Sequence, residues 1–232
     1  MPRLYLIPTP IAPDQGQVLG YLAPLLEVLE VFLVEHPKTA RRFIRSLCPT
    51  KDLNALQLFV LDKRTTRAEL YQFLETLPQD VRVGVLSEAG CPGIADPGAL
   101  AVAYAHQHGW EVVPLVGPSS ILLALMASGL NGQGFSFHGY LPIKETERLQ
   151  SIQKLERTSA KNGYAQLFIE TPYRNQALFG LLLRSLAPTT RLCVAADIGA
   201  TSALIRTRSV AQWKNETSPE IHKRPAIFIL QA

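Results

Sequence analysis

Short apolar runs alternate with amphipathic stretches in the first half of the chain. Apolar runs of strand length lie at residues 3–7, 31–35, 81–86 and 111–116. Helical patterns lie between or after them at residues 23–29, 39–47, 67–77 and 97–108. Strands that alternate with helices form parallel sheets covered by helices, so an α/β domain is predicted here. Thr66 and Glu69 are predicted to form a capping box at the start of one helix.

The order of elements changes after residue 130. Strand patterns lie at residues 135–140, 166–170, 191–197, 203–209 and 225–230, and helical patterns at residues 121–130, 146–158 and 174–186. This order predicts a second domain with a mixed sheet. With no low-complexity linker or internal repeat to separate them, we place two α/β domains at residues 1–116 and 117–232.

A loop of small, turn-forming and acidic residues follows the apolar run at 81–86. Gly90, Gly93 and Gly98 allow the backbone to approach a ligand, and Asp96 and Pro97 are predicted as the N-cap and first residue of the next helix. The loop lies at the carboxyl end of a predicted parallel strand, where open α/β sheets bind ligands. It therefore predicts a ligand site, although a tight turn alone would explain the same residues.

A second loop of this kind, Gly117-Pro-Ser-Ser120, follows the run at 111–116. Two such loops at successive strand ends are predicted to face one crevice. Neither contains the lysine of a phosphate-binding loop, and the sequence has no G-x-G-x-x-G, which disfavours nucleoside triphosphates and dinucleotides.

Composition is typical of a globular enzyme. The 232 residues are 47% hydrophobic and 18% charged, with no apolar run of membrane-spanning length and no signal-peptide pattern. The cysteines, Cys48, Cys91 and Cys193, are odd in number and far apart, as in proteins of a reducing compartment. We expect a cytoplasmic protein without disulfides, and the histidines show no metal-ligand spacing.

The charge balance is mildly basic, with 23 Lys and Arg against 19 Asp and Glu, a net charge of +4. This permits nucleic acid as a partner without requiring it. Basic residues gather in three places, which can equally be solvated surfaces: Lys38, Arg41, Arg42 and Arg45; Lys63, Arg64 and Arg67; and Arg206 with Arg208.

Several motifs together resemble one protein family. Leu86-Ser-Glu-Ala-Gly-Cys-Pro-Gly-Ile-Ala-Asp-Pro-Gly98 is similar to the Ser-Asp-Ala-Gly-Thr-Pro-Gly-Ile-Ser-Asp-Pro-Gly signature of the tetrapyrrole methylase superfamily, in particular its 16S rRNA cytidine 2′-O-methyltransferase branch. The resemblance continues, in the family's order, through Leu4-Tyr-Leu-Ile-Pro-Thr-Pro-Ile11, Val116-Gly-Pro-Ser-Ser120, Phe135-Ser-Phe-His-Gly-Tyr-Leu-Pro-Ile-Lys144 and Phe168-Ile-Glu-Thr-Pro-Tyr-Arg174.

This resemblance implies two α/β domains with S-adenosylmethionine in the cleft between them, usually in a homodimer. Carried over residue by residue, it assigns to the cofactor Pro8, Thr9, Pro10, Ala89, Gly90, Cys91, Pro92, Ile94, Ser119, Ser120, Glu170, Ala196, Asp197, Pro225 and Ala226. Ser119 and Ser120 can instead cap a helix, and Cys91, which stands where the branch has Thr, can be inert packing.

The acceptor side is less similar. The segment Glu35-His-Pro-Lys-Thr-Ala-Arg-Arg42 resembles the branch's Glu-Asp-Thr-Arg-x-Thr-Arg-Arg, and so implies that Arg41 and Arg42 bind substrate. If the acceptor is a hydroxyl, Glu88, Glu35 and His36 are candidate general bases because they close or follow predicted strands. A carboxylate at a strand end can equally bind a helix terminus or an arginine.

The segments Leu61-Asp-Lys-Arg-Thr-Thr66 and Ala195-Ala-Asp-Ile-Gly-Ala-Thr-Ser202 depart from the branch. Three functions therefore stay open. The first is a methyltransferase acting on RNA at a ribose 2′ hydroxyl, the second a methyltransferase of a tetrapyrrole or other small molecule, and the third a cofactor-binding module without methyl transfer.

Overall fold

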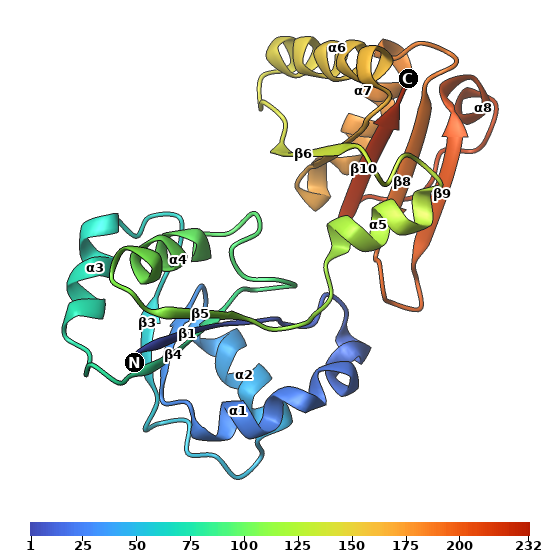
Figure 1. The fold of residues 1–232 in the computed structure, drawn as a ribbon. Helices are drawn as coiled ribbons and strands as arrows, with labels where there is room; N and C mark the ends of the chain where they lie inside the picture. The colour runs from blue at the N-terminus through green and yellow to red at the C-terminus, as the bar shows by residue number, and fades with distance from the viewer. The chain divides into compact units, whose positions relative to one another are not determined.

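The computed structural model describes the backbone of residues 1–232 and the side chains of residues 1–13 and 19–232. The chain divides into two compact units, Met1–Ser119 and Ser120–Ala232. Each unit is described by itself (Figure 1). The domain boundary expected between residues 116 and 117 stays a prediction.

Unit 1 is built on a parallel five-stranded sheet, in the order β3-β2-β4-β1-β5. Its strands are β1 (Arg3–Ile7), β2 (Val31–Val34), β3 (Gln57–Val60), β4 (Arg82–Leu86) and β5 (Glu111–Pro114). Nearly continuous apolar residues make the central strands β2 and β4 suitable for a sheet buried on both faces.

Helices cover both faces of this sheet. The 3₁₀ helix η1 (Pro13–Leu22), α1 (Ala23–Val28) and α2 (Pro37–Leu47) pack on one face, in a core with Ile7 and Phe32. The helices α3 (Arg67–Glu75) and α4 (Gly98–Gln107) pack on the other, with Leu4 and Val85. The chain thus leaves β1 and β2 toward one face and β4 toward the other. Such a reversal between neighbouring strands opens a crevice at their carboxyl ends.

Unit 2 contains a mixed sheet in the order β6-β7-β10-β8-β9. Strands β6 and β7 are parallel, and the other pairs are antiparallel. Its elements are α5 (Ser120–Ser128), β6 (Phe135–Tyr140), α6 (Glu145–Asn162), β7 (Ala165–Ile169), η2 (Pro172–Arg174), α7 (Asn175–Ser185), β8 (Arg191–Ala196), β9 (Leu204–Ser209), α8 (Val210–Lys214) and β10 (Ala226–Gln231).

Two cores stabilise unit 2, one on each face of the sheet. Residues of α6, α7 and α8 form the larger core, in which the Trp213 indole packs on Phe179 and donates a hydrogen bond of 2.8 Å to the Leu192 carbonyl. Helix α5 packs on the opposite face, against β7, β8 and β10. The predicted α/β class, with a mixed second sheet, is confirmed.

The main differences from the predicted elements lie in short or weakly patterned segments. Strand β3 and helix α8 were not predicted, and α6 is longer than expected. Helix α4 begins at Gly98 with Pro97 as its N-cap, so the prediction of Asp96 as N-cap was wrong. The Asp96 carboxylate instead accepts the N–H groups of Gly93 and Gly98, both at 2.7 Å. The capping box of Thr66 and Glu69 is confirmed.

Candidate functional site

Loops from β1, β4 and β5 meet at the carboxyl edge of the first sheet. Thr9 and Gly90 exchange two backbone hydrogen bonds of 2.9 and 3.0 Å, which join the loop after β1 to the loop after β4. The Thr9 hydroxyl also donates to the Ser87 carbonyl at 3.2 Å. The Cys91 thiol lies 3.4 Å from the Pro118 carbonyl oxygen and contacts the loop after β5. Segments separated by about a hundred residues therefore form one rigid edge.

Glycines make this close approach possible. Gly90 has a φ of +78°, and a Cβ there would lie 3.3 Å from the Pro118 oxygen and 3.4 Å from Ile11 Cγ2. A Cβ on Gly117 would overlap the Pro8 ring, 2.0 Å from its Cβ atom. The loops thus present backbone rather than bulky side chains, which suits a ligand held against main-chain groups.

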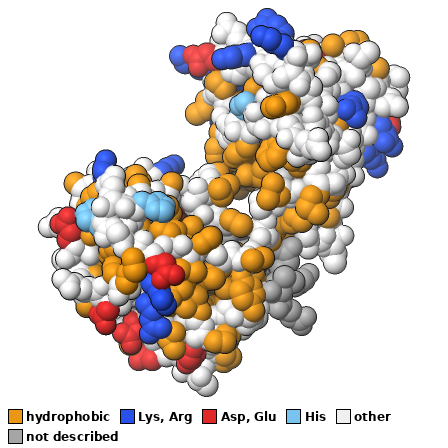
Figure 2. All heavy atoms as spheres, in the orientation of Figure 1, with side chains coloured by type: hydrophobic (Ala, Val, Ile, Leu, Met, Phe, Trp, Pro, Cys, Tyr) orange, Lys and Arg blue, Asp and Glu red, His pale blue; other side chains and the backbone are white. Residues whose placement is uncertain are grey.

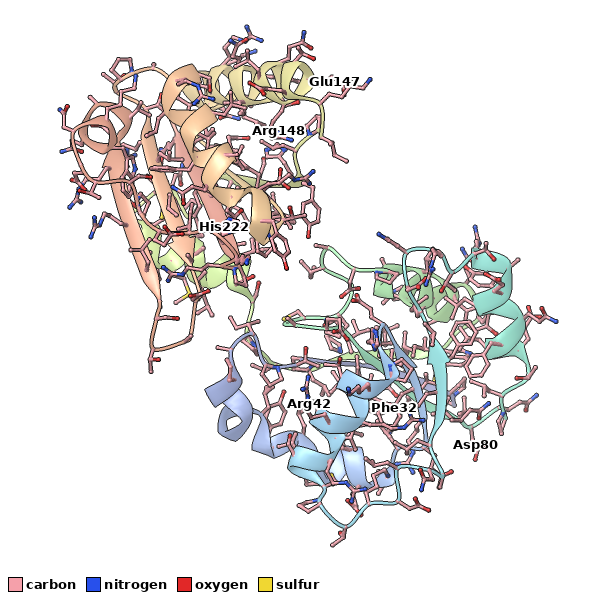
Figure 3. The ribbon with its side chains drawn as sticks, turned by 180° about the vertical axis from the view of Figure 1, so that it is seen from behind. Phe32, Arg42, Asp80, Glu147, Arg148 and His222 are labelled. Carbon is pink, nitrogen blue, oxygen red and sulfur yellow. The ribbon has the colours of Figure 1, made fainter. Side chains whose placement is uncertain are left out.

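A groove of about 650 Å³ lies in unit 1 beside these loops and α2. Its walls include apolar Pro10, Ile11 and Phe43, and its polar groups include Thr39, Arg42 and Glu88. The Thr39 hydroxyl donates to Glu88 Oε2 at 3.3 Å. Figure 3 shows Arg42 on α2. The groove therefore combines an apolar surface with one exposed guanidinium and one exposed carboxylate.

Carboxylates gather where β2 and β4 end. Burial raises the pKa of Glu35, and the charges of Asp96, Glu88 and Asp62 raise it further, while a hydrogen bond from the Glu88 backbone N–H acts the other way. Burial likewise raises the pKa of Asp96, although the hydrogen bonds that its carboxylate accepts from two backbone N–H groups lower it in part. The Asp96 Oδ2 atom is buried without a hydrogen-bond partner. This edge consequently carries negative potential that suits a cationic ligand.

The predicted acceptor residues lie on or next to the groove. Glu35 and His36 follow β2, and exposed His36 is the N-cap residue of α2 without a side-chain cap. Arg42 lines the groove, whereas Arg41, the next residue of α2, is exposed and lies outside the set of described residues that form the groove walls. The structure brings Glu88 and Arg42 together; it does not bring Arg41 to the same surface.

The predicted cofactor residues of unit 2 gather at one edge of the second sheet. Ala196 and Ala226 are register partners of β8 and β10, and the Asp197 N–H donates to the Pro225 carbonyl at 2.9 Å. Asp197 has a φ of +50° and binds Arg224 Nε at 2.7 Å. These residues are neighbours even though about thirty positions separate them in the sequence. Their part in cofactor binding stays a prediction.

Glu170, which follows β7, is the centre of a buried ion network. Its side chain is 0% exposed, and its Oε1 atom accepts from Arg174 Nη2 at 2.7 Å and from the Thr171 N–H at 2.7 Å. Arg148, labelled in Figure 3, lies 3.8 Å from Oε2 and also donates to the carbonyls of Pro142 and Ile143. The Glu170 carboxylate therefore holds its own loop to the start of α6.

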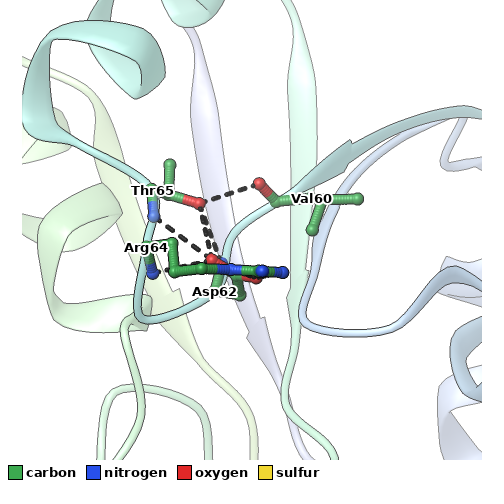
Figure 4. Close-up of polar contacts among 4 residues, drawn as sticks. All are labelled: Val60, Asp62, Arg64 and Thr65. Atoms are coloured by element: carbon green, nitrogen blue, oxygen red, sulfur yellow. Dashed lines mark hydrogen bonds and ion pairs between the residues drawn. The ribbon is translucent and has the colours of Figure 1, made fainter.

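Two of the three basic clusters have structural partners. Arg206 and Arg208 on β9 both bind Glu216. After β3, Arg64 binds Asp62, whose carboxylate also accepts the N–H groups of Arg64 and Thr65 (Figure 4). On the face drawn in Figure 2, Lys and Arg side chains lie in separate groups rather than in one block. Helix α2 is left as the basic element that adjoins the groove.

Thr39, Phe43, Ser46 and Ser87 line the groove but were not singled out from the sequence. Three of them follow one another on α2 at helical spacing, three or four residues apart, which is the signal that could have found them. Among the residues whose side chains are described, no group of three His, Cys, Asp or Glu side chains could hold a metal ion.

Several curated relatives carry the name Ribosomal RNA small subunit methyltransferase I. The protein from Vibrio cholerae is 32% identical over 177 residues, which are 75% of this chain and 57% of the relative. That from Mesorhizobium japonicum is 29% identical over 216 residues, which are 89% of this chain and 67% of the relative. The matches thus span about three fifths of the relatives' lengths. No family model matches the chain.

Solved methyltransferase structures share the fold. The methyltransferase CobJ aligns with a TM-score of 0.61 and 18% identity, over 99% of this chain and 93% of its own. Uroporphyrin III C-methyl transferase from Thermus thermophilus aligns with a TM-score of 0.53 and 19% identity, over 99% and 97%. The signature loop at the carboxyl end of β4, the sequence similarity and the shared fold agree. The chain is therefore similar in sequence to ribosomal RNA methyltransferases and shares the fold of solved methyltransferases, in line with the resemblance of its signature loop to the tetrapyrrole methylase superfamily.

Proposed function

We propose that this protein is an S-adenosylmethionine-dependent methyltransferase that acts on RNA, at a ribose 2′ hydroxyl. The observation that carries the proposal is the joined edge of unit 1, where three glycine- and proline-rich loops adjoin a groove that Arg42 and Glu88 line. The relatives named as ribosomal RNA methyltransferases support RNA as the acceptor.

The proposed cofactor residues of unit 1 are Pro8, Thr9, Pro10, Ala89, Gly90, Cys91, Pro92, Ile94 and Ser119. Those of unit 2 are Ser120, Glu170, Ala196, Asp197, Pro225 and Ala226. The edge of unit 1 fits this cofactor because Gly90 and Gly117 leave backbone groups accessible and because nearby carboxylates favour a cation. When bound, the cofactor supplies an activated methyl group; the protein's task is to orient the acceptor and exclude water.

On the acceptor side, Arg42 is proposed to bind a phosphate and Glu88 to accept the hydroxyl proton. Glu88 lines the groove and its Oε2 atom is fixed by Thr39, which gives it a defined position. Glu35 lies behind it and accepts the Glu88 backbone N–H, so it is proposed to orient that loop. His36 remains the third candidate base, and Arg41 a second phosphate ligand.

We further propose a cytoplasmic homodimer that uses its two domains, 1–116 and 117–232, together. The ribosomal RNA named for the relatives supports the compartment. In the part of the chain that the structure describes, no helix is long and apolar enough to cross a membrane. Sedimentation at several protein concentrations tests the dimer.

Transfer of a labelled methyl group separates the proposed functions. Cofactor carrying a labelled methyl is incubated with protein and either total RNA or the small-molecule pool of the cell, and the labelled RNA is digested to nucleosides. A labelled 2′-O-methyl nucleoside is expected. Label in a tetrapyrrole would support the alternative of a small-molecule methyltransferase, the activity named for one of the fold neighbours. Cofactor binding without methyl transfer to either pool would support a cofactor-binding module.

Glu88→Gln tests the base within that reaction. Because amide replaces carboxylate with little change of shape, cofactor affinity should be kept while kcat falls by ~10²- to 10⁴-fold. Glu30→Gln changes an exposed acid just before β2 and serves as the matched control. An unchanged kcat for Glu88→Gln would move the question to Glu35 and His36.

A further inference from the structure

An exposed aromatic ring lies next to a lysine ammonium group and a histidine ring at one edge of unit 2. Tyr173, in η2 just after β7, is 70% exposed. The His222 ring stands edge-on to it at a centroid distance of 6.2 Å, and the Lys223 ammonium lies 5.9 Å from its centroid. Figure 3 labels His222 at this edge. A large, mostly exposed ring of this kind contributes little to the core of its own unit.

The backbone holds these groups in place. The Lys223 N–H donates to the Pro172 carbonyl at 2.9 Å, which joins the loop before β10 to the loop that carries Tyr173. Lys223 has a φ of +61°, a left-handed conformation that a lysine rarely adopts. Ile221, two residues before it, is fully buried and anchors the loop. The ring and the ammonium group are therefore presented by a fixed surface rather than by free loops.

Two acidic side chains at this edge are paired with arginines, so the Lys223 ammonium is available to bind an anion. Arg174 binds Glu170 and Arg224 binds Asp197, so both acids already have an arginine. Among the described residues Lys223 has no ion pair, and the nearby Glu220 carboxylate accepts the backbone N–H of His222. An exposed ring beside an uncompensated ammonium matches a base and its phosphate.

We propose that Tyr173, His222 and Lys223 form a stacking platform for an unpaired nucleotide of single-stranded RNA. The base stacks on the Tyr173 ring and the phosphate contacts Lys223, with His222 bordering the ring. An unpaired base is required because the bases of a duplex are stacked on each other and cannot reach the ring. The platform rests on the proposed function, and it adds to it an RNA-binding surface on unit 2.

Binding of a short fluorescent single-stranded RNA to the whole protein tests the platform. Tyr173→Ala should weaken binding by about 5- to 150-fold, the range for loss of one stacked base, while Tyr173→Phe stays near wild type. The slope of log affinity against log salt is negative, and Lys223→Gln should make it less steep by about 0.7. An RNA of the same length with an abasic position should bind wild type more weakly and abolish the effect of Tyr173→Ala.

Matched controls are Tyr164→Ala, which removes another exposed tyrosine just before β7, and Lys154→Gln on the exposed surface of α6; neither should change RNA binding. Cofactor affinity is measured for every variant. The platform is overturned if folded Tyr173→Ala keeps its RNA affinity. It is also overturned if the variant loses affinity only for the cofactor, or loses the same affinity for single-stranded and duplex RNA. If wild type methylates RNA and Tyr173→Ala binds RNA normally, only the platform is overturned. If wild type neither binds nor methylates RNA, the proposed function is overturned as well.

Discussion

Gly90 shows how a single residue sets the geometry of the candidate site. Its φ of +78° and the closeness of Pro118 and Ile11 leave no room for a branched side chain. Gly90→Val should abolish cofactor binding and cost roughly 1–2 kcal/mol of stability through the left-handed backbone alone. Calorimetric titration of the folded variant measures the first effect and urea unfolding the second.

Gly109→Val is the matched control for this prediction. Gly109 has a similar φ of +68° but nothing within 4 Å of a Cβ, and it precedes β5 at the opposite edge of the sheet. It should lose a similar amount of stability and keep cofactor affinity. Normal titration of Gly90→Val would remove this loop from the cofactor site.

Glu35 gives a prediction for pH. Its pKa is raised from the usual 4.5, mainly by burial, so above pH 4.5 the folded state holds a proton that the unfolded state has lost. The free energy of unfolding therefore falls as pH rises from 4.5 through the raised pKa. Glu35→Gln lacks this titration, and its stability relative to wild type should increase over that interval. Denaturant unfolding at a series of pH values measures the difference; parallel profiles would contradict it.

At the scale of elements, α2 links the basic surface to the groove. Arg42 lines the groove, Arg41 is exposed outside the groove walls, and Arg45 donates to the Pro49 carbonyl. Arg42→Ala should weaken RNA binding and leave cofactor affinity unchanged. The negative slope of log RNA affinity against log salt concentration should become less steep by about 0.7 per lost phosphate contact.

Neighbouring arginines of α2 provide the comparison. Arg41→Ala should have a smaller effect than Arg42→Ala, and Arg45→Ala none, when binding is measured over the same salt series. Equal losses for all three variants would mean that α2 acts through its total charge and not through the groove.

Elements also show where sequence patterns lose information. In the edge strand β3 the two end residues are exposed and the two central ones half-buried, and the strand contains only Gln57–Val60, too short for a clear period. Helix α8 has five residues, although Ser209 and Gln212 form a capping box that the sequence could have indicated. In contrast, Thr66 and Glu69 were recognised because a longer helix follows them.

At the scale of the whole molecule, the cysteines report on each unit separately. Cys48 is buried in a core of unit 1 and Cys193 in a core of unit 2, and burial raises the pKa of both thiols. Cys91 is half-buried, and burial followed by the charge of Asp96 raises its pKa. Pulsed alkylation with mass spectrometry should label Cys91 in the native protein.

Cys48 and Cys193 should react ~10³-fold or more slowly than in denaturant, because labelling requires their cores to open. With rising denaturant each thiol then gives the unfolding curve of its own unit. Native Cys193 that reacts as fast as Cys91 would contradict the packing of β8 in the second core.

The sequence by itself determined the local features of this protein. Apolar runs placed most strands within one or two residues. The glycines and prolines of the signature loop indicated a turn-rich ligand loop and a family resemblance, because turn chemistry depends on neighbouring residues. It also indicated Glu88 and Arg42, which the structure brings to one groove.

Tertiary structure decided which distant segments meet. Strand β4 lies between β2 and β1, and only this order brings Gly90 to Thr9 and Glu88 to Thr39. The packing of Lys223 against Pro172 and Tyr173 likewise joins segments about fifty residues apart. Such contacts follow from strand order and from the burial of whole faces, and neither leaves a periodic trace in the sequence.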